Sequence, residues 1–422
     1  MKSLLLIAIL PLQAFGAGVN PRIHTQYNRA LSGVLSNLRP NGAVIASPST
    51  SEPNYYYDWV RDTGLTMRAL IRIAYDKKTD PSLRLRLSEQ ISRWIQWEFS
   101  RQEQNRLTGL GEPRFYVDGR VNEEPWGRPQ NDGPAIRALT AMEVAEQWLK
   151  EGRLKEVNRL LYAPSLPAQT LIKRDLEYVA HHWKEKSFDL WEEEQALHYY
   201  TLLSQKTALL KGAAFARRLG DSGASRFYAS AAAEIETLLQ QFKDTYSGVI
   251  PYAIEKSPGL PHKKSILDIS VILALIHNYD GSFAAPTDSA LMTLKELMRV
   301  FRIKYPVNHV IRNKSGEALG VALGRYPEDI YDGVGFSGGN PWFISTLAIA
   351  ELACDLSRSR TGKKRDALNE IALSQFNRVI HHLDEKGSMS EQFNRENGFQ
   401  QGARDLTWSY VSYLTAYRAC FL

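Results

Sequence analysis

The chain is poor in cysteine and lacks the P-loop and HExxH motifs. Only two of its 422 residues are cysteines, Cys354 and Cys420, which excludes a disulfide-rich scaffold and a cysteine-based zinc finger. It contains neither a P-loop nor an HExxH motif. The pairs His181–His182 and His381–His382 point to different faces of their helices, so they are poor joint metal ligands. The sequence therefore predicts neither a metal nor another cofactor.

Charge of one sign is also scarce. The 52 basic and 46 acidic residues leave a net charge of +6, and the densest basic run is the short segment 363–365. Proteins that bind nucleic acid concentrate basic residues on one face or in one motif. We therefore expect no nucleic-acid partner.

The chain has no apolar run long enough to span a membrane. A shorter apolar run lies at its start. The seven residues 4–10 are apolar, Lys2 precedes them, and Pro11 and the small residues of 14–16 follow. This pattern predicts a signal peptide at 1–16, because the run is too short to span a bilayer; a buried N-terminal strand is the alternative. Export with only two cysteines favours a secreted or periplasmic protein of bacterial origin. The sequence does not decide whether Cys354 and Cys420 pair, and two buried thiols are the simpler expectation.

The dominant periodicity is that of an α-helix. Apolar residues recur at helical spacing in Val60, Gly64, Met67 and Ile71, for example, and strand-like alternation is rare. Helices are expected at 21–36, 59–75, 82–101, 133–150, 169–185, 195–219, 221–242, 265–277, 287–303, 341–358, 365–383 and 403–419. Segments 115–117 and 307–311 could form hairpin arms. No linker divides the chain, so residues 17–422 are predicted to be one all-α domain, a closed ring of paired helices.

Two long loops, at 106–134 and 313–341, are rich in Gly, Pro, Trp and Arg, and loops of that length are usually functional. Trp126 and Arg128 lie in the first loop and Arg325 in the second. Tryptophans 94, 97, 148 and 183 follow helical spacing instead and are predicted to be core residues. We expect the long loops to gather at one end of the ring.

Carboxylates suited to acid–base chemistry occur in two further segments. In Asp189–Glu194 (DLWEEE), neighbouring carboxylates and an indole would raise the pKa of one carboxyl, as a general acid requires. The alternative is an acidic run at the N-terminus of a helix. In Gly387–Gln392 (GSMSEQ), Glu391 lies among small residues whose donors could keep it ionised as a base, although an ordinary helix cap would look similar. Arg61 and Asp62, after three tyrosines, present the donor fork and acceptor pair that grip vicinal hydroxyls of a sugar.

Taken together, these motifs resemble the glucoamylase family, glycoside hydrolase family 15, whose members are inverting exo-acting α-glucosidases with an (α/α)6 barrel. The resemblance covers about residues 25–420 in family order and is carried by the segments 57–62, 109–113, 126–130, 132–134, 189–193, 324–329, 339–343, 387–392 and 403–410.

The resemblance implies hydrolysis of terminal α-1,4-linked glucose, and more slowly α-1,6-linked glucose, with release of β-glucose. Glu192 would be the general acid and Glu391 the general base. Substrate-binding roles would fall to Tyr55, Trp59, Arg61, Asp62, Trp126, Gly127, Arg128, Asp189, Glu193, Arg325, Trp342 and Trp408, with Tyr331 also lining the pocket. The substrates would be soluble starch, dextrins and maltooligosaccharides, because no starch-binding module is recognisable, and the protein would be a monomer.

Two alternatives remain open at this point. One is another inverting α-glycosidase on the same ring, such as an isomaltosidase or a dextran-acting enzyme. The other is a glucan-binding protein without catalysis, which the presence of both Glu192 and Glu391 disfavours. The chain also departs from fungal members in two places: Gly402 stands where they often have Ser, and the segment 331–339 is longer, so outer subsites should differ. Losing a hydroxyl donor at 402 should raise the pKa of the base, which Gly402→Ser should reverse.

Overall fold

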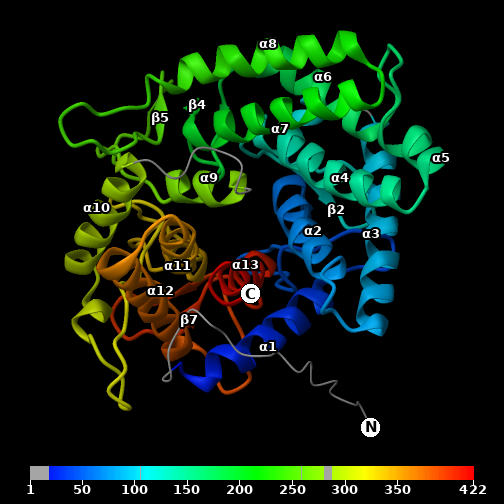
Figure 1. Ribbon diagram of the computed structural model, residues 1–422. Coiled ribbons are helices and arrows are strands. Elements are labelled where there is room, and N and C mark those ends of the chain that lie inside the picture. Colours follow the sequence, from blue (N-terminus) through cyan, green and yellow to red (C-terminus); the bar gives the residue numbers. More distant parts are fainter. Residues whose placement is uncertain (1–18, 105, 258, 280–287) are drawn as a thin grey trace.

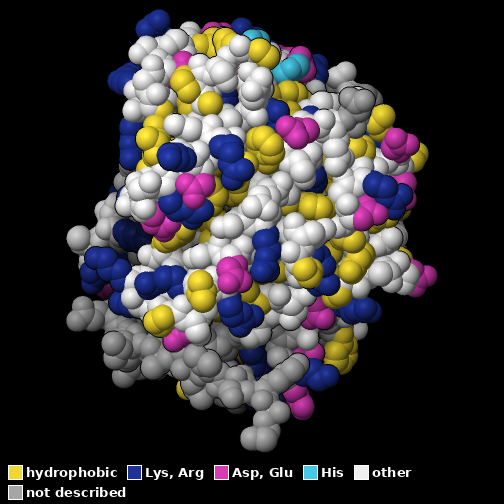
Figure 2. Space-filling view, turned by 90° about the vertical axis from the view of Figure 1, so that its right-hand side faces the viewer, with side chains coloured by type: hydrophobic (Ala, Val, Ile, Leu, Met, Phe, Trp, Pro, Cys, Tyr) yellow, Lys and Arg dark blue, Asp and Glu magenta, His cyan; other side chains and the backbone are white. Residues whose placement is uncertain are grey.

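Helices make up most of the described chain. The computed structural model describes residues 19–104, 106–257, 259–279 and 288–422, so the predicted signal peptide at 1–16 lies outside the described residues. Within these ranges, no helix combines the length and the apolar character that a membrane crossing requires. On the face shown in Figure 2, basic and acidic side chains are interspersed. The expectation that the protein binds no nucleic acid stays a prediction.

Six helices form a closed inner ring. Each helix contacts the next one along the chain, and the last contacts the first (Figure 1). The six are α2 (Val60–Ala74), α4 (Asp132–Lys150), α7 (Tyr199–Arg218), α9 (Ser270–Asn278), α11 (Phe343–Arg358) and α13 (Thr407–Phe421). In α11, for example, every residue before the last one is buried. A helix that is apolar all round is typical of such an interior position.

A second set of helices covers the inner ring from outside. It consists of α1 (Pro21–Asn37), α3 (Pro81–Gln102), α6 (Leu171–His182), α8 (Ser222–Leu239), α10 (Asp288–Lys304) and α12 (Gly362–His382). These helices bury one stripe: in α8, Ala224, Tyr228, Ala231 and Ile235 are buried at helical spacing. The described chain adds the short α5 (Leu154–Glu156) and the turn Val157–Leu161. The predicted all-α (α/α)6 barrel is confirmed, and the helix bounds mostly agree within a few residues.

Short strands occur only in the loops of the described chain. β1 (Tyr57–Trp59) pairs with β2 (Arg114–Tyr116), while β3 (Ser187–Phe188), β4 (Gln195–His198) and β5 (Ala253–Ile254) form a second sheet, and β6 (Gln392–Phe393) pairs with β7 (Gln400–Gln401). The expected hairpin arm at 115–117 overlaps β2. The one at 307–311 is wrong, because Pro306–His309 forms a 3-10 turn. Asn308 stabilises that turn by donating to the carbonyl oxygens of Phe301 and Ala322.

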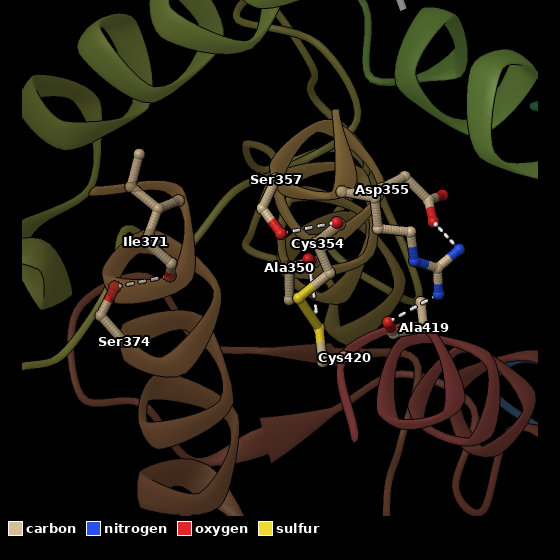
Figure 3. Close-up of a disulfide and its surroundings, with 9 residues drawn as sticks. Ala350, Cys354, Asp355, Ser357, Ile371, Ser374, Ala419 and Cys420 are labelled. Carbon is tan, nitrogen blue, oxygen red and sulfur yellow. Dashed lines mark hydrogen bonds and ion pairs between the residues drawn. A yellow bond between two sulfur atoms is a disulfide. The ribbon is translucent and has the colours of Figure 1, made fainter. Parts of the chain in front are cut away.

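A disulfide joins two neighbouring helices of the inner ring. Cys354 on α11 and Cys420 on α13 are paired, with a Cα–Cα distance of 5.2 Å (Figure 3). Beside the bridge, Arg358 pairs with Asp355 at 3.1 Å and donates to the carbonyl of Ala419 at 2.8 Å. The expectation of two buried thiols is therefore wrong. The pairing depends on two helices that are distant in sequence lying side by side, which periodicity does not reveal.

We expect the Cys354→Ala/Cys420→Ala protein to unfold more easily than the wild type. The bridge closes a loop of 66 residues, and a loop of that length stabilises a fold by at most about 4 kcal/mol. Urea unfolding of the double variant and of the oxidised wild type measures the difference. Thiol titration of the unfolded, unreduced wild type provides the check, since two free thiols would contradict the pairing.

Candidate active site

A cavity of about 300 Å³ opens at the end of the ring where the inner helices begin. Its walls come from the loops and first turns at the N-termini of α2, α4, α7, α11 and α13, so residues far apart in sequence meet there. They are Ala46, Tyr55, Trp59, Arg61, Asp62, Trp126, Gly127, Leu190, Trp191, Glu192, Glu193, Arg325, Tyr331, Phe336, Trp342, Glu391, Leu406 and Trp408. The expected convergence of the long loops is observed.

A buried aspartate fixes the strand that carries Trp59 into this cavity. Asp58, in the middle of β1, is fully buried. It accepts hydrogen bonds from Thr63 Oγ1 at 2.7 Å, Trp97 Nε1 at 3.0 Å and the Val44 amide at 3.0 Å, which belong to three different segments. Because β1 continues directly into α2, the same anchor sets the position of the first turn of α2.

That first turn places a buried guanidinium beside the carboxylates of the cavity. Arg61 donates to Gln130 Oε1 at 2.9 Å and to Asp132 Oδ2 at 3.2 Å, and it pairs with Asp62 at 3.3 Å. Burial raises the pKa of Asp62 to about 6, although Arg61 opposes the rise. A buried cation must be paired. These contacts hold the guanidinium of Arg61 over the ring of Trp408, with its Cζ 5.6 Å from the ring centroid.

Glu192 is held by two side-chain donors. Its Oε1 accepts from Trp59 Nε1 at 2.6 Å and from Gln130 Nε2 at 2.9 Å, and Arg61 lies 4.0 Å away. The backbone of Glu192 has φ +67°, in the left-handed region that residues other than glycine rarely adopt. Strain of this kind is tolerated where surrounding structure enforces it, and it clusters at functional sites. The turn therefore aims this carboxyl into the cavity.

The next two carboxylates of the same run have other partners. Glu193 accepts from Arg325 at 2.6 Å and from Tyr326 Oη at 2.8 Å. Glu194 accepts from Tyr252 Oη at 2.7 Å and from the Leu260 amide at 3.1 Å, so it holds a neighbouring loop. The run is followed by β4, and α7 begins only at Tyr199. The alternative of an acidic helix N-terminus is therefore wrong for this segment.

Glu391 lies on the loop before α13 and is fully buried. Burial raises the pKa of Glu391 to about 8, while nearby tyrosine hydroxyls and Arg325 oppose the rise. Tyr331 Oη lies 3.4 Å from Glu391 Oε2 and 3.2 Å from Tyr55 Oη. The other oxygen, Oε1, accepts no hydrogen bond from the described residues. Oε1 is thus a buried acceptor whose lone pairs no donor of the described residues uses.

Gly402 lies directly against this carboxyl. Its φ is +74°, and a Cβ there would come within 2.4 Å of Glu391 Oε2. A serine cannot enter without moving the carboxylate, so its hydroxyl would not simply replace the missing donor. The expected effect of Gly402→Ser on the pKa of Glu391 therefore stays a prediction, and on this backbone the substitution would also displace the carboxylate.

Aromatic rings cover the rest of the wall. Trp191 stacks near Trp408 with centroids 6.4 Å apart and an angle of 24° between planes. Trp59 meets Tyr55 at 5.5 Å and Trp126 at 6.3 Å in edge contacts. Apolar ring faces next to buried charged groups match the two kinds of surface on a sugar, its C–H faces and its hydroxyls.

Two predicted binding residues lie outside the cavity. Arg128 pairs with Glu112 at 2.9 Å, and Asp189 accepts from the amides of Glu193 and Glu194 at 2.8 and 3.1 Å. Both shape the loops that form the wall, and their contact with substrate stays a prediction. The other predicted residues line the cavity.

Some wall residues were not among the predicted binding residues. Trp191 lies within the DLWEEE motif, so the motif itself indicated that this residue belongs to the site. Ala46, Leu190, Phe336 and Leu406 are apolar residues without any motif that marks them as part of a site. Only the fold brings them to the cavity.

Comparisons with known proteins agree with this geometry. A sequence model of glycosyl hydrolases family 15 matches residues 26–418. A glucoamylase from Blastobotrys adeninivorans is 36% identical, over 94% of this chain and 71% of its own length. A solved structure of a glucoamylase from Saccharomycopsis fibuligera aligns with a TM-score of 0.82 and 28% identity, covering 97% of this chain and 98% of that one.

A third relative bears on where the protein acts. It is described as an intracellular, sporulation-specific glucoamylase of Saccharomyces cerevisiae, and it is 28% identical over 92% of this chain and 80% of its own length. These relatives are fungal, which weighs against the bacterial origin that the sequence suggested. The match to the family model over nearly the whole length, with the two glutamates facing one cavity, leads to one assignment: the chain belongs to glycosyl hydrolases family 15.

Proposed function

We propose that the protein is a glucoamylase. It removes single glucose units from the non-reducing ends of starch, dextrins and maltooligosaccharides, cutting α-1,4 links and more slowly α-1,6 links, and it releases β-D-glucose. The observation that carries this proposal is that Glu192 and Glu391, separated by 199 positions in the sequence, face the same aromatic-walled cavity.

In the proposed first step, Glu192 acts as the general acid. It protonates the glycosidic oxygen as the bond to the terminal glucose breaks, and the sugar ring gains oxocarbenium-like charge. Trp59 and Gln130 hold Oε1 of Glu192, which fixes the direction of the carboxyl. Tyr55 lies on the cavity wall beside Trp59, where its ring can pack against the sugar as the charge develops.

Glu391 acts as the general base. It takes a proton from a water molecule, which attacks the anomeric carbon from the face opposite the leaving oxygen and so inverts the configuration. Inverting glycosidases need their two carboxyl groups roughly 6.5–9.5 Å apart to admit this water. The free Oε1 of Glu391 supports the assignment, since a base must have a lone pair that no protein donor already uses.

Fixed charged groups in the cavity wall support exo action. Arg61, Asp62 and Arg325 line the wall together with the glutamates, and each is held by partners in the protein. In the proposal, they bind the hydroxyls of the terminal glucose, which has no further sugar on its non-reducing side. A pocket that ends in fixed donors and acceptors accepts a chain end and rejects the middle of a chain.

We expect the wild type to release β-glucose from maltotriose and both isosteric variants to fail. Glu192→Gln and Glu391→Gln each remove one ionisable group at almost unchanged shape, and a positioned acid or base contributes about 10²- to 10⁴-fold to the rate. Glucose release and proton NMR of the first product measure both outcomes.

The Glu194→Gln variant serves as the matched control, because Glu194 lies in the same run but holds a loop. It should keep far more activity than Glu192→Gln. Initial appearance of α-glucose would reject the inverting mechanism, and full activity in either isosteric variant would reject the role of that glutamate.

We expect the acid limb of the kcat/KM profile to lie above pH 4.5, the ordinary pKa of a glutamic acid. Glu391 must be ionised to act as base, so activity rises as the pH passes its pKa, and burial raises that pKa to about 8. Tyr331 opposes this rise by donating to Glu391, so Tyr331→Phe should move the limb to still higher pH. A limb at or below pH 4.5, or one that Tyr331→Phe leaves in place, would contradict the assignment.

We also propose that the protein is exported and acts as a monomer on soluble glucans. The apolar run at 4–10 and the Cys354–Cys420 pairing support export, because disulfides persist in oxidising compartments. N-terminal sequencing of protein from the medium of the native host should find a chain that begins near residue 17. Recovery from the cell interior with Met1 still present would overturn the export proposal.

A further inference from the structure

The segment 331–339 forms the outer wall of the cavity on the side of the catalytic base. Tyr331 and Phe336 line the cavity, and their ring centroids are 6.5 Å apart. Tyr331 is half-buried, whereas Phe336 is 75% exposed. The wall therefore runs from Glu391 outward to the mouth of the cavity and ends in an exposed aromatic ring.

One carboxylate gives this segment a defined shape. Asp332 accepts hydrogen bonds from the amides of Val334 at 3.0 Å, Gly335 at 2.6 Å and Ser337 at 3.2 Å, and also from the Ser337 hydroxyl. These donors lower the pKa of Asp332 to about 2. A ring presented on a loop that is already ordered can bind without a large loss of conformational entropy.

The first residues of the segment 331–339 pack against the loop that carries Glu391. A Cβ on Gly333 would come within 2.8 Å of Gly402 Cα, and Gly402 in turn touches Glu391. Tyr331 Oη lies 3.0 Å from the Gly333 carbonyl oxygen, and the side chain of Gln401 donates to the Asp332 carbonyl at 2.6 Å. The position of Phe336 is thus set relative to the point of bond cleavage.

Val334 and Phe336 are two exposed apolar side chains on this segment, and only Phe336 lines the cavity. Val334 is 63% exposed and lies away from the cavity lining, whereas Phe336 forms part of that lining. Phe336 extends the aromatic wall of Tyr331 and Trp342 outward, and a contiguous apolar patch that reaches the rim of a site marks contact with a ligand. Val334 provides a neighbour of similar exposure that should not make this contact.

We propose that Phe336 determines chain-length preference by packing on the sugar units beyond the first one on the leaving-group side. The inference rests on the proposed function: if the terminal glucose fills the closed end, the remaining chain must leave through the mouth. Phe336 stands there, outside the buried groups that surround Glu192 and Glu391. It binds these outer sugars equally in the ground state and the transition state, so it acts on KM more than on kcat.

The test compares maltose, which ends one unit past the cleavage point, with maltopentaose. For Phe336→Ala, the ratio of kcat/KM on maltopentaose to that on maltose should fall about fivefold, in line with the loss of one aromatic contact. The fall should arise in KM for maltopentaose. Phe336→Tyr should keep the wild-type ratio, and so should Val334→Ala.

Calorimetric binding of both sugars, with Glu192→Gln as the parent protein, decides the question without turnover. Adding Phe336→Ala to Glu192→Gln should weaken maltopentaose binding about fivefold and leave maltose binding unchanged. An unchanged ratio, an equal loss for both sugars, or the same fall in Val334→Ala would overturn the proposal. A wild type that releases no glucose would contradict the proposed glucoamylase function. The proposal for Phe336 would still hold if Phe336→Ala, added to Glu192→Gln, weakened the binding of maltopentaose and not that of maltose.

Discussion

The contact between α13 and α2 closes the inner ring, and the site depends on that closure. The loop before α2 supplies Trp59, and the loop before α13 supplies Glu391, so the first and last parts of the chain meet in one cavity. The loops that precede α2, α4, α7, α11 and α13 all reach this cavity. Residues distant in sequence become neighbours without any long detour of the chain.

Two buried arginines organise the wall of the cavity. Arg61 contacts the side that holds Glu192, with Asp62 and Asp132 as counter-ions. Arg325 is fixed by both oxygens of Asp329 and reaches Glu193. Since a buried guanidinium is stable only with such partners, each arginine locks several loops at once. The charged groups that we propose bind the substrate are therefore held in place by the protein itself.

The two glutamates differ in their surroundings, and the difference follows from packing. Glu192 is partly exposed and accepts from an indole and an amide, whereas Glu391 is fully buried and has weaker, longer contacts with a tyrosine. Gly402 can approach Glu391, and Gly333 can approach Gly402, because neither glycine has a side chain. The same closeness places the outer loop of 331–339 next to the base.

The amino-acid sequence by itself determined the helices, the motifs and the two glutamates, because helical periodicity and local residue chemistry are readable along a chain. Only the tertiary structure decided that Cys354 and Cys420 pair, that Arg128 and Asp189 support the wall from behind, and that Phe336 stands at the mouth. It also decided that Glu194 holds a loop although it adjoins Glu192. Each of these outcomes depends on which distant segments touch, and contacts of that kind leave no periodic trace in the sequence.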